Sequence, residues 1–173
     1  MNTELFFPAP QELPAVIHPP RGSKETLKAL ERYDWNSAGQ TQLADLLRAG
    51  ALWLHGFLDE SHAIAQGISS AEGSYWHALM HRSEGDFSNS KYWYRRVGRH
   101  SIFPDLRAAA LRLQASSPSA SRAQWLRSSD WDPSRFVDAI EHAAGPEADD
   151  TGLLQAIARE EYNLLMGYCL AKS

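Results

Sequence analysis

The chain has 173 residues, of which 43% are hydrophobic and 22% charged, and its formal net charge is −4. This length suits one domain that buries enough surface to fold without a disulfide or a structural metal. The acidic balance excludes a general nucleic-acid binder, and no apolar run is long enough to cross a membrane. A single cysteine, Cys169, cannot form an internal disulfide, and the N-terminus lacks a signal-peptide pattern, so we expect a cytoplasmic protein.

Proline dominates the first 21 residues. Five of the nine prolines lie within the first twenty positions, and proline lacks the backbone N–H that helices and sheets require. Apolar residues such as Phe6, Phe7 and Ile17 are interspersed among them, which a solvated tail would not need. We therefore predict an extended arm over residues 1–21 that lies on the domain or on a neighbouring subunit, which makes a homo-oligomer one expectation. Residues 22–173 are then the helical domain.

Helical periods, capping residues and glycine stops recur through that domain, and no stretch shows the sustained alternation of a strand. The sequence therefore predicts an all-α, single-domain bundle of about seven to eight helices. The expected segments are a helix capped by Ser23, then Thr41–Gly50, Leu52–Gln66, Ser69–Glu84, Ser88–Val97, Leu106–Leu113, Ser121–Leu126, Pro133–Ala144 and Gly152–Ala171.

Five of the seven histidines lie between His55 and His100, and helical spacing arranges four of them in two polar rows. The short connection between the two helices makes them antiparallel neighbours. A turn centred near Ile68 sets His55 level with His81, whereas a turn centred near Ser70 places His62 between the histidines of the second row. The two rows are His55, Asp59, His62 and Gln66 on the first helix, and His77, His81 and Glu84 on the second.

Imidazole and carboxylate groups in such rows are ligands for zinc, iron, manganese or nickel. We expect His62, His77 and His81 to be metal ligands, with Glu161 of the last helix as a further ligand or as the ion-pair partner of an arginine. Asp59 or Glu84 would orient a ligand or act as general base, and a hydrolytic reaction through metal-bound water is the plainest chemistry. The alternative is a non-catalytic interaction protein in which both rows form a structural hydrogen-bond network. Whether the protein is an enzyme stays open.

Positive charge concentrates between Arg82 and Arg112, where seven Lys or Arg residues accompany three Asp or Glu. Basic and aromatic side chains together can hold the phosphate or carboxylate of a small anionic ligand. The alternative is a solvated face paired with Glu84, Asp86 and Asp105. The candidate ligand-binding residues are Arg82, Lys91, Tyr92, Arg95, Arg96 and Arg99.

Two resemblances follow from the same stretch. The run Gly85-Asp86-Phe87-Ser88-Asn89-Ser90-Lys91-Tyr92-Trp93-Tyr94-Arg95-Arg96-Val97 resembles the second helix of a tetratricopeptide-type repeat, with Ala78 at the small packing position of the first helix. The likeness covers about residues 74–104, has no second copy, and puts His77 and His81 where that family keeps apolar residues. The longer block formed by DESH at 59–62, GSYWHALMHR at 73–82 and DFSNSKYWYRRV at 86–97 is similar to a family of uncharacterised proteins, which implies no activity.

Overall fold

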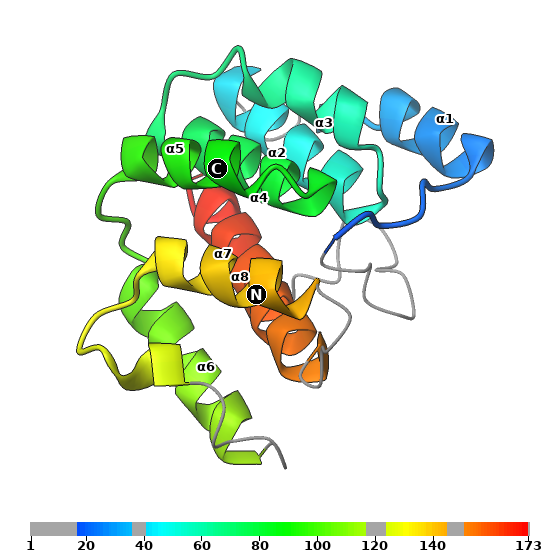
Figure 1. Cartoon of the computed structure of the whole chain (residues 1–173). Coiled ribbons are helices and arrows are strands. Elements are labelled where there is room, and N and C mark those ends of the chain that lie inside the picture. The colour runs from blue at the N-terminus through cyan, green and yellow to red at the C-terminus, as the bar shows by residue number, and fades with distance from the viewer. Residues whose placement is uncertain (1–16, 36–40, 117–123, 145–150, 173) are drawn as a thin grey trace.

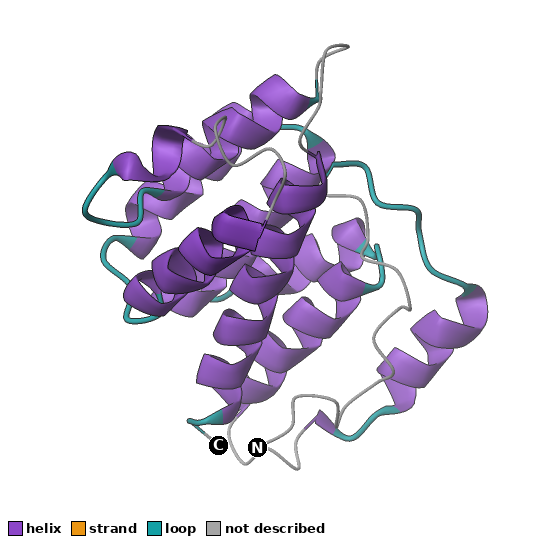
Figure 2. Cartoon of the chain, turned by 90° about the horizontal axis from the view of Figure 1, so that it is seen from below, coloured by secondary structure: helices purple, strands orange, loops and turns teal. Residues whose placement is uncertain are grey.

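The computed structural model of the chain describes residues 17–35, 41–116, 124–144 and 151–172, and these residues form helices and loops without a strand (Figure 2). The predicted all-α bundle is thereby confirmed. Residues 1–16 of the expected arm and the expected helix start at Ser121 lie outside the described residues. The helices are α1 (Lys24–Arg32), α2 (Thr41–Leu54), α3 (Leu58–Ala65), α4 (Ala71–Glu84), α5 (Phe87–Val97), α6 (Phe103–Ser116), a 3₁₀ helix η3 (Gln124–Arg127), α7 (Pro133–Ala143) and α8 (Thr151–Leu170).

The two helices α4 and α5 pack against each other over their length and form the centre of the arrangement (Figure 1). Helix α3 packs on α2 and on α4, and α5 also contacts α7. The long helix α8 passes behind α7 and contacts α2, α6 and α7. This neighbourhood makes α4 and α5 a helical hairpin, and its likeness to the tetratricopeptide type stays a prediction.

Apolar side chains gather in two clusters, and α8 contributes to both. The first cluster lies among α1 to α5 and includes Trp76 and Met80, with Leu165 from the second half of α8. The second lies among α6, η3 and α7 and includes Phe136, with Ile157 from the first half of α8. All five side chains are almost completely buried, so burying their apolar surface stabilises the packing of α8 across the whole bundle.

The sequence predicted one helix over Leu52–Gln66, and this was wrong. Helix α2 ends at Leu54, and α3 begins at Leu58. Between them Gly56 adopts φ +73°, and a Cβ there would lie 2.2 Å from the carbonyl oxygen of Pro20, so only glycine admits this close approach. The break turns the chain before His55 can join the row on α3.

Capping residues fix where α4 and α5 begin. The Ser70 hydroxyl accepts a hydrogen bond from the Gly73 backbone N–H, so the cap is Ser70 and not the expected Ser69. Helix α4 ends at Gly85, which adopts the left-handed φ of 81°. The Asp86 carboxylate then accepts from the backbone N–H of Asn89, so α5 begins one residue earlier than expected, at Phe87.

The described end of the N-terminal arm lies on the domain. The His18 backbone N–H donates to the carbonyl oxygen of Ser83 at 2.6 Å, and the Gly22 N–H donates to that of His55 at 2.9 Å. Arg21 also pairs with Glu60 on α3. Within the described ranges, no helix combines the length and the apolar character that crossing a membrane requires.

Candidate functional site

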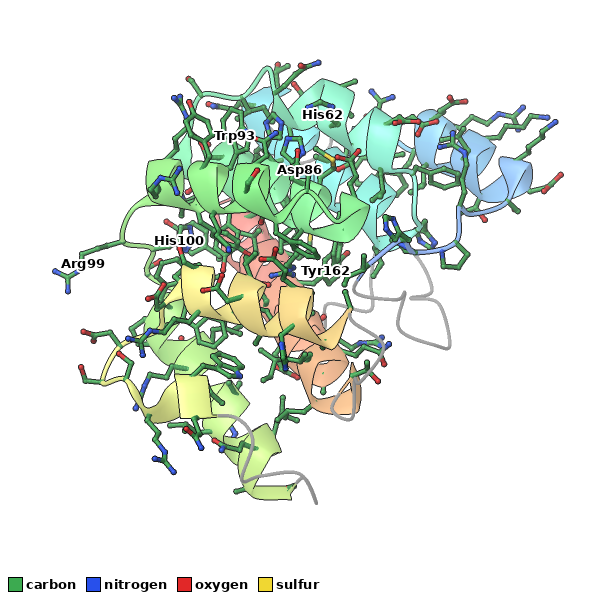
Figure 3. All side chains as sticks on the ribbon, viewed as in Figure 1. His62, Asp86, Trp93, Arg99, His100 and Tyr162 are labelled. Atoms are coloured by element: carbon green, nitrogen blue, oxygen red, sulfur yellow. The ribbon has the colours of Figure 1, made fainter. Side chains whose placement is uncertain are left out.

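Three histidines from two helices meet on one side of the α4–α5 hairpin. The ring centre of His62, on α3, lies 4.5 Å from that of His77 and 5.3 Å from that of His81, both on α4. One ligand nitrogen from each residue can be chosen so that all three lie within 4.8 Å of one another. His62 therefore meets both histidines of the second row, as expected for the turn centred near Ser70. Figure 3 shows His62 and Trp93 on this same side of the molecule.

The close return from α3 to α4 places these rings side by side. A Cβ at Gly73 would lie 2.4 Å from the carbonyl oxygen of Ile68, so the absence of a side chain lets the first turn of α4 approach the end of α3. His77 follows Gly73 by four residues and therefore lies on the same face of α4. The glycine thus sets the distance between the His62 ring and the second row.

His81 is held by two polar neighbours. Its Nδ1 lies 3.1 Å from Oε2 of Glu84, and its Nε2 lies 3.0 Å from the side-chain amide nitrogen of Asn89 on α5. A carboxylate can only accept, so Nδ1–H donates to Glu84 and Nε2 accepts from Asn89. The His81 pKa is lowered by burial and by the neighbouring His62, against the opposing charge of Glu84. The neutral imidazole, which is the metal-binding form, is thereby favoured.

His77 is sandwiched between aromatic rings. The indole of Trp93 stacks on it with ring centres 3.8 Å apart and planes 17° apart, and the His81 ring stacks at 4.8 Å. The His77 side chain is buried, and its Nδ1 has no hydrogen-bond partner. The His77 pKa is lowered to about 4. Burial disfavours the charged imidazolium, and the neighbouring imidazoles of His62 and His81 disfavour a further positive charge beside them.

The spacing of the three nitrogens is wider than that of a filled site. Zinc–nitrogen bonds of about 2.0–2.1 Å in a tetrahedron imply nitrogens about 3.4 Å apart, so the widest pair would close by up to about 1.4 Å. Side-chain rotation would have to supply this movement, and His62 is the one of the three histidines that is only partly buried. With three protein ligands the fourth position of a tetrahedral ion stays open, which is the pattern of catalytic zinc sites.

Of the predicted carboxylates, only Glu84 reaches this cluster. Asp59 is exposed, and its charge acts on Arg21 at the end of the arm. Gln66 is exposed as the C-terminal cap of α3, and His55 lies in the turn after α2. Among the described residues, the first predicted row therefore contributes His62 alone.

Glu161 lies elsewhere, and this corrects its assignment as a metal ligand. Its side chain is fully buried, and Oε2 accepts from Nη1 of Arg82 at 2.6 Å. Oε1 accepts from the hydroxyls of Tyr75 at 2.9 Å and Tyr94 at 2.7 Å. The ion-pair alternative stated for Glu161 is the arrangement found. Arg82 has no exposed surface, so it is not placed to hold a ligand from solvent.

The predicted basic face divides into four parts. Lys91 forms ion pairs with Asp138 and Glu141 on α7, and not with the carboxylates expected in the solvated-face alternative. The guanidinium carbon of Arg95 lies 5.8 Å from the ring centre of Tyr92.

Arg96 and Arg99 form the other two parts of that face. The guanidinium carbon of Arg96 lies 5.1 Å above the indole of Trp93. Arg99 points away from the bundle (Figure 3) and lines a separate cavity of about 530 Å³ with Phe103, Arg107 and Trp131. Arg96 is thus the basic residue that shares an aromatic neighbour with the histidine cluster.

Two residues of this site, Asn89 and Trp93, were not predicted as functional. Both lie on the face of α5 that meets α4, four residues apart, and Arg96 follows three residues later. This i, i+4, i+7 pattern follows the histidine row directly in the sequence, so these residues could have been predicted as neighbours of the histidines. Trp93 was instead interpreted as a core residue. The buried hydroxyls of Tyr75 and Tyr94 carried no comparable signal.

In comparisons with known proteins, no family model, curated protein or solved structure matches the chain.

Proposed function

We propose that the protein binds a divalent metal ion through His62, His77 and His81. The observation that carries the proposal is the convergence of three imidazoles, with one nitrogen from each within 4.8 Å of the others. Three neutral imidazoles suit zinc, iron or nickel better than manganese, which prefers oxygen ligands, and Glu161 is paired with Arg82. Zinc is accordingly the first ion to test.

Glu84 would act as the outer partner of the metal site. Metal-binding histidines commonly donate their second ring N–H to a carboxylate, which fixes the tautomer and strengthens the ligand. In His81 the Nδ1–H already donates to Glu84, so Nε2 is the nitrogen left for the metal. Asn89 occupies this nitrogen in the absence of an ion and would give way to it.

A three-histidine centre with an open position supports hydrolysis by a metal-bound water. The ion lowers the pKa of that water toward 7 and so supplies the nucleophile without a serine or cysteine triad. Cys169 offers no alternative, because burial raises the pKa of its thiol to about 12. His62, the partly exposed ligand, would adjoin the open position.

The experiment is metal analysis of tag-free protein that has been loaded with zinc and dialysed. We expect one tightly bound zinc per chain and a rise in melting temperature on loading. His62→Ala should lose the zinc and keep its fold, since this side chain is only partly buried. His142→Ala, an exposed histidine on α7, is the matched control and should bind zinc as the wild type does. Equal zinc in His62→Ala and wild type, or no zinc in either, would contradict the proposal.

The alternative of a structural network has observations of its own in its favour. His81 already has hydrogen-bond partners at both nitrogens, and His77 is packed against Trp93. In that case His77→Ala and His81→Ala should lower stability by about 2–3 kcal/mol, equally with and without zinc. A loss of stability that appears only in the zinc-loaded comparison identifies the metal site instead.

A further inference from the structure

An arginine stands beside the histidine cluster with no acidic partner among the described residues. Arg96 is exposed, and its one described contact is the indole of Trp93, 5.1 Å below the guanidinium carbon. The same indole stacks on His77 at 3.8 Å, so the guanidinium carbon lies within about 9 Å of the His77 ring. Lys91, one turn away on α5, is by contrast held by two carboxylates of α7.

From this geometry, and resting on the proposed metal site, we propose that the centre takes an anionic small molecule whose phosphate or carboxylate group is bound by Arg96. Helix α5 presents Asn89, Trp93 and Arg96 at i, i+4 and i+7, which is one face. Asn89 contacts His81, Trp93 contacts His77, and Arg96 lies over Trp93. The ligand would thus lie along this face, with its charged group at Arg96 and its other end at the metal.

Trp93 prepares the arginine for this role. A guanidinium stacked on an indole loses part of its freedom before any ligand arrives, and its N–H donors remain in the plane of the stack, available to two oxygens at once. Tyr92, which is 44% exposed, adds a second ring beside the Trp93 indole, with 5.5 Å between the ring centres. The guanidinium of Arg95 lies over this second ring. Two guanidiniums on two aromatic rings form a surface suited to a charged group on an apolar or aromatic body.

Local charge favours an anion once the metal is bound. Two carboxylates lie near the histidines. Glu84 is hydrogen-bonded to His81, and Asp86, at the start of α5, accepts a hydrogen bond from the backbone N–H of Asn89. A divalent ion with the charges of Arg95 and Arg96 outweighs these two negative charges. Without the ion the surface is close to neutral, so anion binding should depend on metal.

The test uses isothermal titration calorimetry on protein whose zinc content has been measured first. The probes are phenylphosphonate and benzoate, with benzamide as the uncharged counterpart of benzoate. We expect zinc-loaded wild type to bind at least one of the two anions at least tenfold more tightly than benzamide, and zinc-free protein to bind neither. Preference between the two anions distinguishes a phosphate from a carboxylate group.

Variants of the full chain locate the contact. Arg96→Gln should weaken anion binding about tenfold or more while leaving zinc content unchanged, and Arg96→Lys should retain part of the affinity. Arg112→Gln, an exposed arginine near the end of α6, is the matched control and should bind as the wild type does.

Zinc-loaded protein that binds no anion, binds benzamide equally well, or is unaffected by Arg96→Gln overturns this inference and leaves the metal site standing. Protein that holds no zinc overturns both.

Discussion

Replacing Glu161 by glutamine tests the buried network that joins α4 to α8. The carboxylate is fully buried and accepts three hydrogen bonds, from Arg82, Tyr75 and Tyr94. Glutamine keeps the size but removes the charge, so the Arg82 guanidinium stays buried without a counter-ion. Removing one partner of a buried pair typically costs about 3–5 kcal/mol, which is a large part of the stability of a domain of this size.

Urea denaturation followed by far-UV circular dichroism measures this loss of unfolding free energy. Tyr75→Phe should cost about 1–3 kcal/mol, because it removes one hydrogen bond to a charged group that keeps its two other donors. Glu160→Gln, the neighbouring half-buried carboxylate, is the control and should change stability by less than about 0.5 kcal/mol. A Glu161→Gln loss below about 1 kcal/mol would refute the argument that this pair is desolvated and mutually dependent.

Three further predictions concern the histidine cluster. The unfolding free energy of the metal-free protein should fall by about 1–3 kcal/mol as the pH drops from 6.5 to 4. In this range His77, with a pKa of about 4, binds fewer protons in the folded protein than in the unfolded chain. Urea midpoints at pH 7 and pH 4.5 measure this, and a His77→Gln variant with an unchanged slope would contradict it. Asn89→Ala should raise zinc affinity about threefold to tenfold in chelator competition, since it frees Nε2 of His81; a lower affinity would show that Asn89 supports the ion. Gly73→Ala should lower stability by about 1–3 kcal/mol and weaken zinc binding, because its Cβ meets the Ile68 carbonyl oxygen; an unchanged melting temperature would exclude this role of the glycine.

The fold class and most helix positions could be predicted from local patterns, because caps and glycine stops act within a few residues. The Ser23 cap and the Gly85 stop, for example, are where the sequence placed them. The break at Gly56 was missed although part of its signal is local: Gly56 ends α2 with a left-handed φ of 73°, as Gly85 ends α4, and the Phe57 N–H donates to the Leu52 carbonyl oxygen. Only the close approach of the Pro20 carbonyl oxygen, 36 positions away in the sequence, lies outside any local pattern, and the continuous helix expected there put His55 into the wrong row.

The candidate site shows the same division. Helical spacing was enough to bring His77 and His81 together, and a short turn was enough to bring His62 near them. The sequence did not decide between the two registers of the α3–α4 hairpin, because the register depends on how closely Gly73 approaches Ile68. The position of Glu161 on the apolar face of α8 indicated that this carboxylate needs a partner. Identifying the partner as Arg82 required the three-dimensional structure.

The pairing of Arg82 with Glu161 also determines the smallest piece of the chain that can serve as a metal-binding module. The three histidines lie within residues 62–81, a length that invites excision as a peptide. A fragment that keeps the whole of α4 would expose Arg82, whose carboxylate partner lies 79 positions away, together with the apolar surface that α8 covers in both clusters. Grafting the centre into another protein would therefore require a host that supplies a buried acid beneath α4, and transplanting the histidines alone would not carry the site with them.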